Sequence, residues 1–134
     1  DLQARLWVIP AERMKAGREH RIPLSDAAVA LLRQQEQVLL AGVNLVFPSV
    51  RDHKPLSDMT LTAVLRRMQR NDLTVHGFRS TFRDWAAEAT DYPQEMAEMA
   101  LAHVVSNKVE AAYRRGDMLE KRREMMQKWA EFIL

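Results

Sequence analysis

Both the fold and the chemistry of this chain are most visible in residues 101–116, which read Leu101-Ala-His-Val-Val-Ser-Asn-Lys-Val-Glu-Ala-Ala-Tyr-Arg-Arg-Gly116. His103 precedes Tyr113 by ten residues, and two arginines follow the tyrosine. Ser106 is a good N-cap and Gly116 suits the C′ position, so a short helix is predicted between them. Taken alone, the tyrosine has a structural explanation, because its spacing from Val109 is that of a half-buried helical pair. His103 alone would be a capping or half-buried histidine.

A second polar cluster, His76-Gly-Phe-Arg79, lies at the start of another predicted helix. His76 and Arg79 are three residues apart, which places their Cβ atoms about 5–6 Å apart on one face. The apolar residues of this helix recur at helical spacing and predict a stripe that faces the core: Phe78, Phe82, Trp85, Ala86 and Ala89. The structural alternative is that His76 simply begins the helix and that Arg79 is a surface charge.

A β-hairpin is predicted at the N-terminal end. Residues 4–10 and 20–24 are largely apolar and read as two short strands. Pro10 should lie at a strand end because it has no N–H to donate, and Gly17 can supply a positive φ for the turn. Lys15 lies near the tip of the hairpin, where the ordinary interpretation is a solvated turn residue.

Four further helices are expected, over about 25–38, 57–70, 93–99 and 117–134. Ser25 and Ser57 cap the first two, and Pro93 suits the first turn of the third. Residues 42–55 read as an irregular connector with a buried centre at 45–47. The side chains expected to face inward are Val29, Leu31, Leu32, Leu61, Val64, Leu65, Met68, Met118, Leu119, Met125, Met126, Trp129, Phe132 and Ile133.

The predicted fold class is therefore mainly α with a small β-hairpin, in one domain. The hairpin spans 1–24, a helical core spans 25–116, and a C-terminal helix spans 117–134. A chain of 134 residues is long enough to bury about two thirds of its unfolded surface. The chain begins with Asp1 and enters a strand almost at once, so we expect it to be part of a longer protein.

Composition excludes several functional classes. There are no cysteines, so disulfides, thiolate metal sites and cysteine nucleophiles are excluded. The four histidines are scattered and none has the H-E-x-x-H spacing of a metal site, so no metal or cofactor is expected. No apolar run reaches the roughly 18 residues of a membrane span, and no signal peptide opens the chain. These features agree with a cytoplasmic location.

The net charge of +2 does not by itself indicate a nucleic-acid partner. Acidic and basic residues are nevertheless segregated along the chain, because residues 84–98 contain acidic residues and no Lys or Arg. Basic residues gather elsewhere: Arg13, Lys15, Arg18, Arg21, Arg66, Arg67, Arg70, Arg114, Arg115, Lys121, Arg122 and Arg123. Such segregation predicts a surface that binds a polyanion. Solvated charge runs on helices are the alternative.

The order of these elements resembles the tyrosine recombinase family, also called the phage integrase family. A strand, a lysine-bearing turn, a strand and helices precede His-x-x-Arg, then Leu-Ala-His, then a tyrosine ten residues later. The sequence is similar to those of prophage-type integrases in four segments: Val75-His-Gly-Phe-Arg-Ser-Thr-Phe82, Leu101-Ala-His103, Asn107-Lys-Val109 and Ala111-Ala-Tyr113. The resemblance covers nearly the whole chain and implies the catalytic-domain fold of that family.

The resemblance also implies roles for individual residues. Tyr113 is expected to be the nucleophile that forms a 3′-phosphotyrosyl intermediate with double-stranded DNA, and Arg79 to clamp the phosphate. His76 and His103 are expected to be further phosphate or proton partners, and Lys15 the general acid. These residues should close around one phosphate, without a metal ion. The resemblance further implies a homo-oligomer on DNA, with exchange of the C-terminal helix between subunits as the hypothesis. The alternative is that this helix packs on its own domain.

One element of the family pattern is absent from this sequence. The family has another catalytic arginine on a helix before the hairpin, and no residue here matches it. A fragment of this kind is expected to be inactive alone. A type IB topoisomerase would use similar chemistry, and a non-catalytic helical DNA-binding or protein-interaction module that keeps the fold is the alternative from another functional class.

Overall fold

The computed structural model describes residues 1–39, 41–50, 52–103 and 117–134. Its N-terminal part is the predicted hairpin, in which β1 (Leu6–Ile9) and β2 (His20–Pro23) pair antiparallel with Leu6 opposite Pro23 and Ile9 opposite His20. The connection begins with a 3₁₀ turn over Ala11–Arg13 and contains Gly17 at φ +60°. β1 is shorter than predicted because Arg5 adopts a positive φ of 54°, which extended strand residues do not.

Five α-helices occur among the described residues: α1 (Asp26–Val38), α2 (Thr60–Arg67), α3 (Gly77–Glu88), α4 (Gln94–Ala100) and α6 (Leu119–Ile133). The mainly helical fold class with one two-stranded sheet is confirmed. Ser25 caps α1, where its Oγ accepts a hydrogen bond from the N–H of Ala28 at 3.3 Å. The helix predicted from Ser106 to Gly116 lies outside the described residues.

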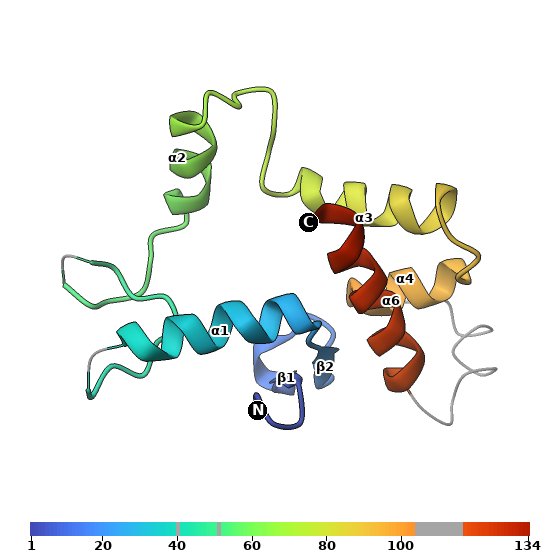
Figure 1. Cartoon of the computed structure of the whole chain (residues 1–134), viewed down its shortest axis with the longest axis horizontal. Helices are drawn as coiled ribbons and strands as arrows, with labels where there is room; N and C mark the ends of the chain where they lie inside the picture. The colour runs from blue at the N-terminus through green and yellow to red at the C-terminus, as the bar shows by residue number, and fades with distance from the viewer. Residues whose placement is uncertain (40, 51, 104–116) are drawn as a thin grey trace.

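The core is formed where α3, α4 and α6 meet (Figure 1). Its fully or nearly buried side chains are Phe82, Trp85, Ala86, Met96, Ala97 and Met125. Trp129 of α6 adds an edge-on contact with Phe82 at 5.4 Å between ring centroids and a tilted contact with Trp85 at 5.1 Å. The predicted core residues Phe82, Trp85, Ala86 and Met125 are confirmed. In addition, α6 packs on β2 and touches α1, so this helix joins the hairpin to the helical core.

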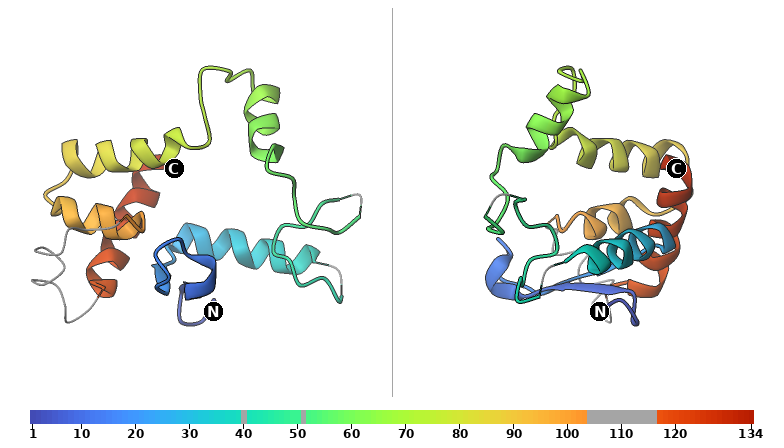
Figure 2. Two further views of the ribbon diagram at one scale, coloured as in Figure 1. Left: turned by 180° about the vertical axis from the view of Figure 1, so that it is seen from behind. Right: turned by 60° about the vertical axis from the view of Figure 1, so that its left-hand side comes forward.

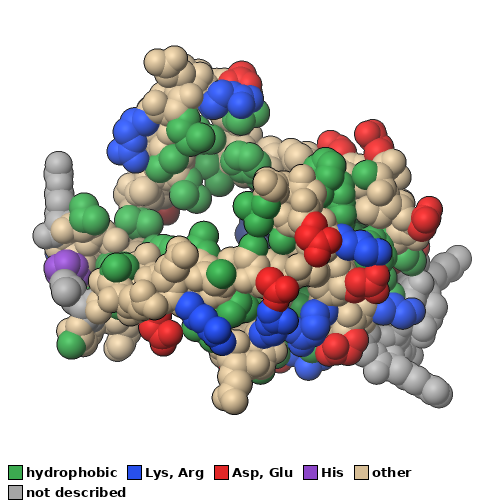
Figure 3. Space-filling model, viewed as in Figure 1, with side chains coloured by type: hydrophobic (Ala, Val, Ile, Leu, Met, Phe, Trp, Pro, Cys, Tyr) green, Lys and Arg blue, Asp and Glu red, His purple; other side chains and the backbone are tan. Residues whose placement is uncertain are grey.

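Helix α2 stands apart from the other helices in Figure 1 and in the left-hand view of Figure 2. Apolar side chains face the open space between α2 and α1 in Figure 3. Leu31, Leu61 and Met68 were predicted to be buried, but they are 54%, 56% and 64% exposed. That prediction is wrong for these three side chains, although Leu65 of α2 is buried. Helical spacing shows where apolar groups gather, and it does not show which of them another part of the chain covers.

Three more burial predictions are wrong. Val46 and Phe47 of the connector are exposed, because the segment runs over the surface beside the isolated α2. Phe78 is half exposed, since α4 and α6 pack against the later turns of α3 that hold Phe82 and Trp85. Phe132 and Ile133 are exposed in the last turn of α6. Across the described part of the chain, every helix is too short or too polar to cross a membrane.

Candidate active site

The first turn of α3 and the turn after α4 meet through Arg79. Its Nη2 donates a hydrogen bond to the carbonyl oxygen of Leu101 at 2.5 Å. Arg79 is a predicted site residue, and Leu101 lies two positions before another, His103. The structure thus brings the guanidinium of Arg79 to the chain segment that carries the imidazole of His103.

The end of α4 has the hydrogen bonds of a Schellman motif. The N–H of His103 donates to the carbonyl of Glu98 at 2.9 Å, and the N–H of Ala102 donates to the carbonyl of Met99 at 3.1 Å. Ala102 occupies the left-handed position with φ +55°, which such a motif requires at C′. This reversal ends the helix and fixes the direction in which the chain leaves it at His103.

The side chain of His103 is held as well. Its Nδ1 lies 2.5 Å from Oε2 of Glu98, and the other carboxylate oxygen of Glu98 lies 2.8 Å from Nε of Arg83 on α3. Glu98 is 19% exposed and His103 41% exposed at the side chain, so the pair lies at the edge of the core with the imidazole toward solvent. Glu98 was not predicted as a site residue; in the sequence it is one member of the acidic run 84–98.

The other two predicted residues of the described part lie further out. His76 immediately precedes α3, one turn from Arg79, and its carbonyl accepts the N–H of Arg79 at 3.1 Å. Lys15 lies in the exposed turn of the hairpin. Within residues 1–39, 41–50, 52–103 and 117–134, neither the imidazole of His76 nor the ammonium of Lys15 makes a hydrogen bond or an ion pair. Tyr113 lies outside the described residues.

His20 is a residue near this site that sequence reasoning missed. It lies at the start of β2, half buried, with its imidazole beside the backbone of Ala100 at the end of α4. Burial and the positive charge of Arg122 lower the pKa of His20, and the backbone of Ala100 and the carboxylate of Asp117 only partly oppose this. Arg79 also acts electrostatically on His20. The sequence places it only as the first residue of the predicted strand 20–24, and nothing in that pattern marks it as a site residue.

The start of α6 is tied to β2 by an ion cluster of Arg21, Asp117 and Arg122. Arg21 donates to both carboxylate oxygens of Asp117, at 2.9 and 2.7 Å. Arg122 is 1% exposed, and its guanidinium donates to the carbonyls of Asp117 at 2.7 Å and Arg21 at 2.9 Å and to the Asp117 carboxylate at 3.0 Å. The prediction that Arg122 belongs to a basic surface is therefore wrong, because these bonds satisfy the buried charge.

Comparison with known proteins gives the family. The model of the phage integrase family matches residues 1–120. The chain belongs to the phage integrase family. The resemblance inferred from the motifs of residues 75–82 and 101–113 is confirmed.

Individual integrases match along nearly the whole chain. Prophage integrase IntA of Escherichia coli (strain K12) is 42% identical over 135 residues, which cover 99% of this chain and 32% of IntA. Prophage integrase IntZ of the same organism is 39% identical over 127 residues, 93% of this chain and 31% of IntZ. The integrase of Enterobacteria phage P4 is 34% identical over 150 residues, 99% of this chain and 34% of the phage protein. The chain spans about one third of the length of these relatives. No solved structure matches it.

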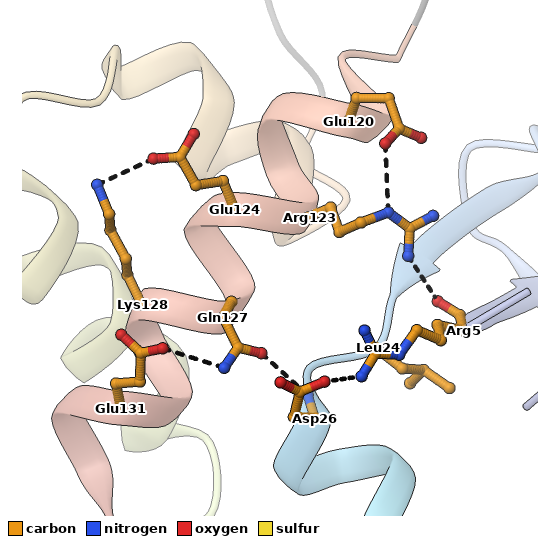
Figure 4. A pocket seen from close by; sticks show the side chains of 9 residues that line it. All are labelled: Arg5, Leu24, Asp26, Glu120, Arg123, Glu124, Gln127, Lys128 and Glu131. Carbon is orange, nitrogen blue, oxygen red and sulfur yellow. Dashed lines mark hydrogen bonds and ion pairs between the residues drawn. The ribbon is translucent and has the colours of Figure 1, made fainter.

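A pocket of about 440 Å³ in this integrase-family chain lies away from the candidate site, between α6, Arg5 and the start of α1 (Figure 4). Its charged side chains pair with one another: Arg123 with Glu120 at 3.3 Å, Lys128 with Glu124 at 3.0 Å, and Arg5 with Asp26. Of the predicted site residues that the structure describes, Lys15, His76, Arg79 and His103, none lines it. We interpret this pocket as part of a polar interface between α6, the hairpin and α1, and not as the active site.

The lowered pKa values of His20 and Asp117 predict acid sensitivity of the fold. An unfolded histidine has a pKa of about 6.5, so below that pH the unfolded state binds more protons than the folded state. The free energy of unfolding should therefore fall as the pH drops through about 6.5, by less than about 1.4 kcal/mol per pH unit for one proton. The lowered pKa of Asp117, whose pairing with Arg21 and Arg122 outweighs its burial, adds a second loss as the pH falls below about 4.

Urea unfolding at pH 7.5, 6.0 and 5.0 measures the first effect. The variant His20→Gln should lose part of the decline between pH 7.5 and 5.0. The matched control is His53→Asn, because His53 is exposed in the connector at φ +54°, a conformation that asparagine tolerates. An identical pH dependence in the wild type and in His20→Gln would contradict the prediction.

Proposed function

We propose that this chain is the C-terminal catalytic part of a tyrosine recombinase that integrates DNA at specific attachment sites. In this proposal Tyr113 attacks a phosphodiester of double-stranded DNA and forms a 3′-phosphotyrosyl intermediate. The supporting observation is the contact of Arg79 with the turn that carries His103, in a chain whose family match covers both and extends over Tyr113.

A tyrosine nucleophile suits the chemistry of strand exchange. The covalent phosphoester keeps the energy of the broken bond for religation, whereas attack by water would lose it. The phenol has a pKa near 10, so forming tyrosinate at pH 7 costs about 4 kcal/mol. A proton acceptor and nearby cations must offset that cost, which are the roles we propose for a histidine and for Arg79.

Arg79 is suited to hold the attacked phosphate. A guanidinium has five N–H donors in a planar fork, and one of its terminal nitrogens is used for the carbonyl of Leu101. The remaining donors are available to the non-bridging oxygens, where charge develops during the reaction. We propose that His76, one turn away at the start of the same helix, is a further phosphate partner.

Lys15 is the proposed general acid. The departing 5′ oxygen needs a proton, and a lysine that is still protonated at neutral pH can donate it. The exposed hairpin turn between β1 and β2 would allow the ammonium to approach bound DNA. β2 itself is tied to α6 through Arg21 and Asp117, so the base of the hairpin is anchored next to the candidate site.

We further propose that the chain acts within a longer recombinase. The family's additional catalytic arginine and its DNA-clamping domain would come from residues that precede this chain, and without them the chain alone should cleave little DNA.

Double-stranded DNA is the proposed partner, and we propose that the recombinase binds it as a homo-oligomer. In the structure α6 packs on its own chain through Met125 and Trp129. Exchange of α6 between subunits on DNA remains a prediction. It would require these core contacts to form again in the neighbouring subunit.

Covalent trapping tests the proposed function. The full-length recombinase is incubated with an attachment-site duplex that carries a nick close to the cleavage position, so that the released strand diffuses away. We expect a protein–DNA adduct that peptide mass spectrometry assigns to Tyr113. An adduct on another residue, or cleavage that leaves only free DNA ends, would contradict the proposal.

Loss of the guanidinium should slow cleavage strongly. In the full-length recombinase, Arg79→Ala should lower the rate of adduct formation by about 10²–10³, the usual effect of removing one preorganised donor from a transition-state oxygen. The control is Arg33→Ala, which removes an exposed arginine of α1 and should change the rate less than about threefold. A similar rate for Arg79→Ala and Arg33→Ala would exclude a catalytic role for Arg79.

A further inference from the structure

The C-terminal end of α4 leaves two carbonyl groups to be satisfied by other parts of the fold. The last four carbonyls of an α-helix have no partner within the helix. The backbone turn after α4 satisfies three carbonyls, with the donor–acceptor pairs Leu101–Ala97 at 3.0 Å, His103–Glu98 at 2.9 Å and Ala102–Met99 at 3.1 Å. No backbone N–H of the described part of the chain donates to the next two carbonyls, those of Ala100 and Leu101. These two acceptors lie where the chain leaves α4 toward His103.

Side chains from two other elements bind these carbonyls. Nη2 of Arg79, in the first turn of α3, donates to the carbonyl of Leu101 at 2.5 Å. The imidazole of His20, the first residue of β2, forms a hydrogen bond with the backbone of Ala100. Taken alone, that bond raises the pKa of His20, so the acceptor is the carbonyl, because a bond accepted from an N–H group would lower the pKa. The turn after α4 is therefore held both by α3 and by the hairpin.

The strand that carries His20 is itself anchored. His20 pairs with Ile9 in the sheet. The carbonyl of the next residue, Arg21, accepts the guanidinium of Arg122 at 2.9 Å, and the side chain of Arg21 donates to Asp117. His20 is half buried, and burial together with the charge of Arg122 lowers its pKa, so the imidazole is neutral at pH 7.5 and has one N–H to donate. These bonds join β2 to α6 and give the imidazole a fixed base.

The turn of residues 101–103 needs support from outside. Ala102 adopts a left-handed backbone with φ +55°, a conformation that is free of strain for glycine but not for alanine. A backbone of this kind persists where the surrounding contacts determine it. His20 and Arg79 supply two such contacts. The position of His103, the last residue of the turn, therefore depends on the hairpin as well as on α3 and α4.

We propose that His20 is a positioning residue, which holds the turn of residues 101–103 to the base of the hairpin and so fixes His103 relative to the strand pair that carries Lys15. In this role His20 acts through the carbonyl of Ala100 and touches neither DNA nor the reacting atoms. The catalytic part of this inference rests on the proposed recombinase function. The alternative is a histidine that contributes only to the stability of the whole fold.

The wild-type chain provides the first test. A ring N–H that is bonded to a buried carbonyl exchanges slowly with water, so His20 should give a separate ring N–H proton signal in NMR spectra of the 134-residue chain at pH 7.5. Through-bond correlations within the ring assign the signal. We expect a cross-relaxation contact between this proton and the α proton of Ala100. Absence of the signal or of the contact would overturn the proposal, whether or not any variant folds.

Amide hydrogen exchange distinguishes positioning from general stability. His20→Leu has no donor, and it should raise the exchange rates of the Ala102 and His103 amides about tenfold, the effect of one lost hydrogen bond. His20→Gln keeps a donor and should stay close to the wild type. The amide of Ala89, which donates to Trp85 at the end of α3, is the internal control and should change less than about twofold. Unchanged rates in the turn, or an equal rise at Ala89, would overturn the positioning role.

The kinetic consequence is tested in the full-length recombinase at saturating DNA. His20→Leu should lower the rate of adduct formation by about 10- to 10²-fold, since a displacement of about 1 Å in a catalytic group can cost 10²-fold. Duplex affinity should not change, and His20→Gln should recover most of the rate. The control His53→Asn, at an exposed histidine of the connector, should keep the wild-type rate.

The outcomes of the kinetic test are separable. A wild-type rate in His20→Leu would overturn the catalytic part of the proposal, and so would a loss of duplex affinity with an unchanged rate at saturation. Absence of any adduct in the wild type would instead refute the proposed function. The exchange rates of the turn would still decide whether His20 holds it.

Discussion

Replacing Tyr113 by phenylalanine in the full-length recombinase should abolish covalent attachment of the protein to DNA and leave duplex binding unchanged. The substitution removes one oxygen atom, and that oxygen is the proposed nucleophile, for which water is no substitute because it cannot form the protein–DNA bond. Denaturing gel electrophoresis measures the adduct, and a native gel shift measures binding. Tyr92 offers a matched control, since it is the other of the two tyrosines in the chain and packs against the core. Tyr92→Phe should still form the adduct.

The same experiment separates the two functional classes. If the chain were a non-catalytic module that keeps the fold, Tyr113→Phe would leave every property unchanged, and the wild type would form no adduct. If Tyr113→Phe still became attached to DNA, the nucleophile would be another residue. Loss of duplex binding in Tyr113→Phe would mean that the phenol serves in recognition instead.

Removing the buried charge of Arg122 should have the largest effect on stability. Arg122→Met keeps a side chain of comparable length but leaves the carbonyls of Arg21 and Asp117 without their donors. Asp117 would also lose one of its two cations. Asp117 stays paired with Arg21, so we expect most of the loss to come from the carbonyls, and a buried acceptor without its donor costs about 1–3 kcal/mol. Urea unfolding measures the loss. The free energy of unfolding of the variant should be smallest at low pH, where Asp117 also becomes protonated.

Lys121→Met is the matched control for this prediction. Lys121 precedes Arg122 on the same helix, but its side chain is exposed. The substitution should change the free energy of unfolding by less than about 0.5 kcal/mol. Equal effects of the two variants would show that the ion cluster does not stabilise the junction of β2 and α6.

Local signals in the sequence were sufficient for most elements of the fold. A few neighbouring residues are enough to predict where a helix begins and which face it buries. Examples are the capping residue Ser25, Pro93 before α4, and the spacing of Phe82, Trp85 and Ala86. Such patterns depend on backbone geometry that any helix shares. They therefore predicted the hairpin, the existence of the five described helices and the centre of the core, although α2 is shorter than the predicted 57–70.

The errors concern contacts between distant segments. The apolar face of α2 is real in the sequence, but only the packing of the chain decides whether Leu61 is covered. Arg122 and Lys121 are neighbours with the same charge, and only the approach of β2 distinguishes the buried one from the exposed one. Sequence periodicity carries no information about such an approach.

The candidate site shows the same division. Arg79 and His103 were predicted from motifs, whereas the hydrogen bond of Arg79 to Leu101 and the pairing of His103 with Glu98 depend on how α3 and α4 pack. Glu98 was missed because it lies in an acidic run that resembles an ordinary solvated surface, and His20 because the strand pattern of residues 20–24 does not show that its imidazole is half buried. In both cases burial, and not residue type, marks the position.

The contact of Trp129 with Trp85 gives the chain an intrinsic optical reporter. The two indoles lie 5.1 Å apart across α6 and α3, and Trp85 is buried, whereas Trp7 is 56% exposed. Fluorescence emission from Trp85 and Trp129 should depend on whether α6 is packed against α3. Movement of that helix, including its transfer to a neighbouring subunit, can therefore be followed in solution without an attached dye.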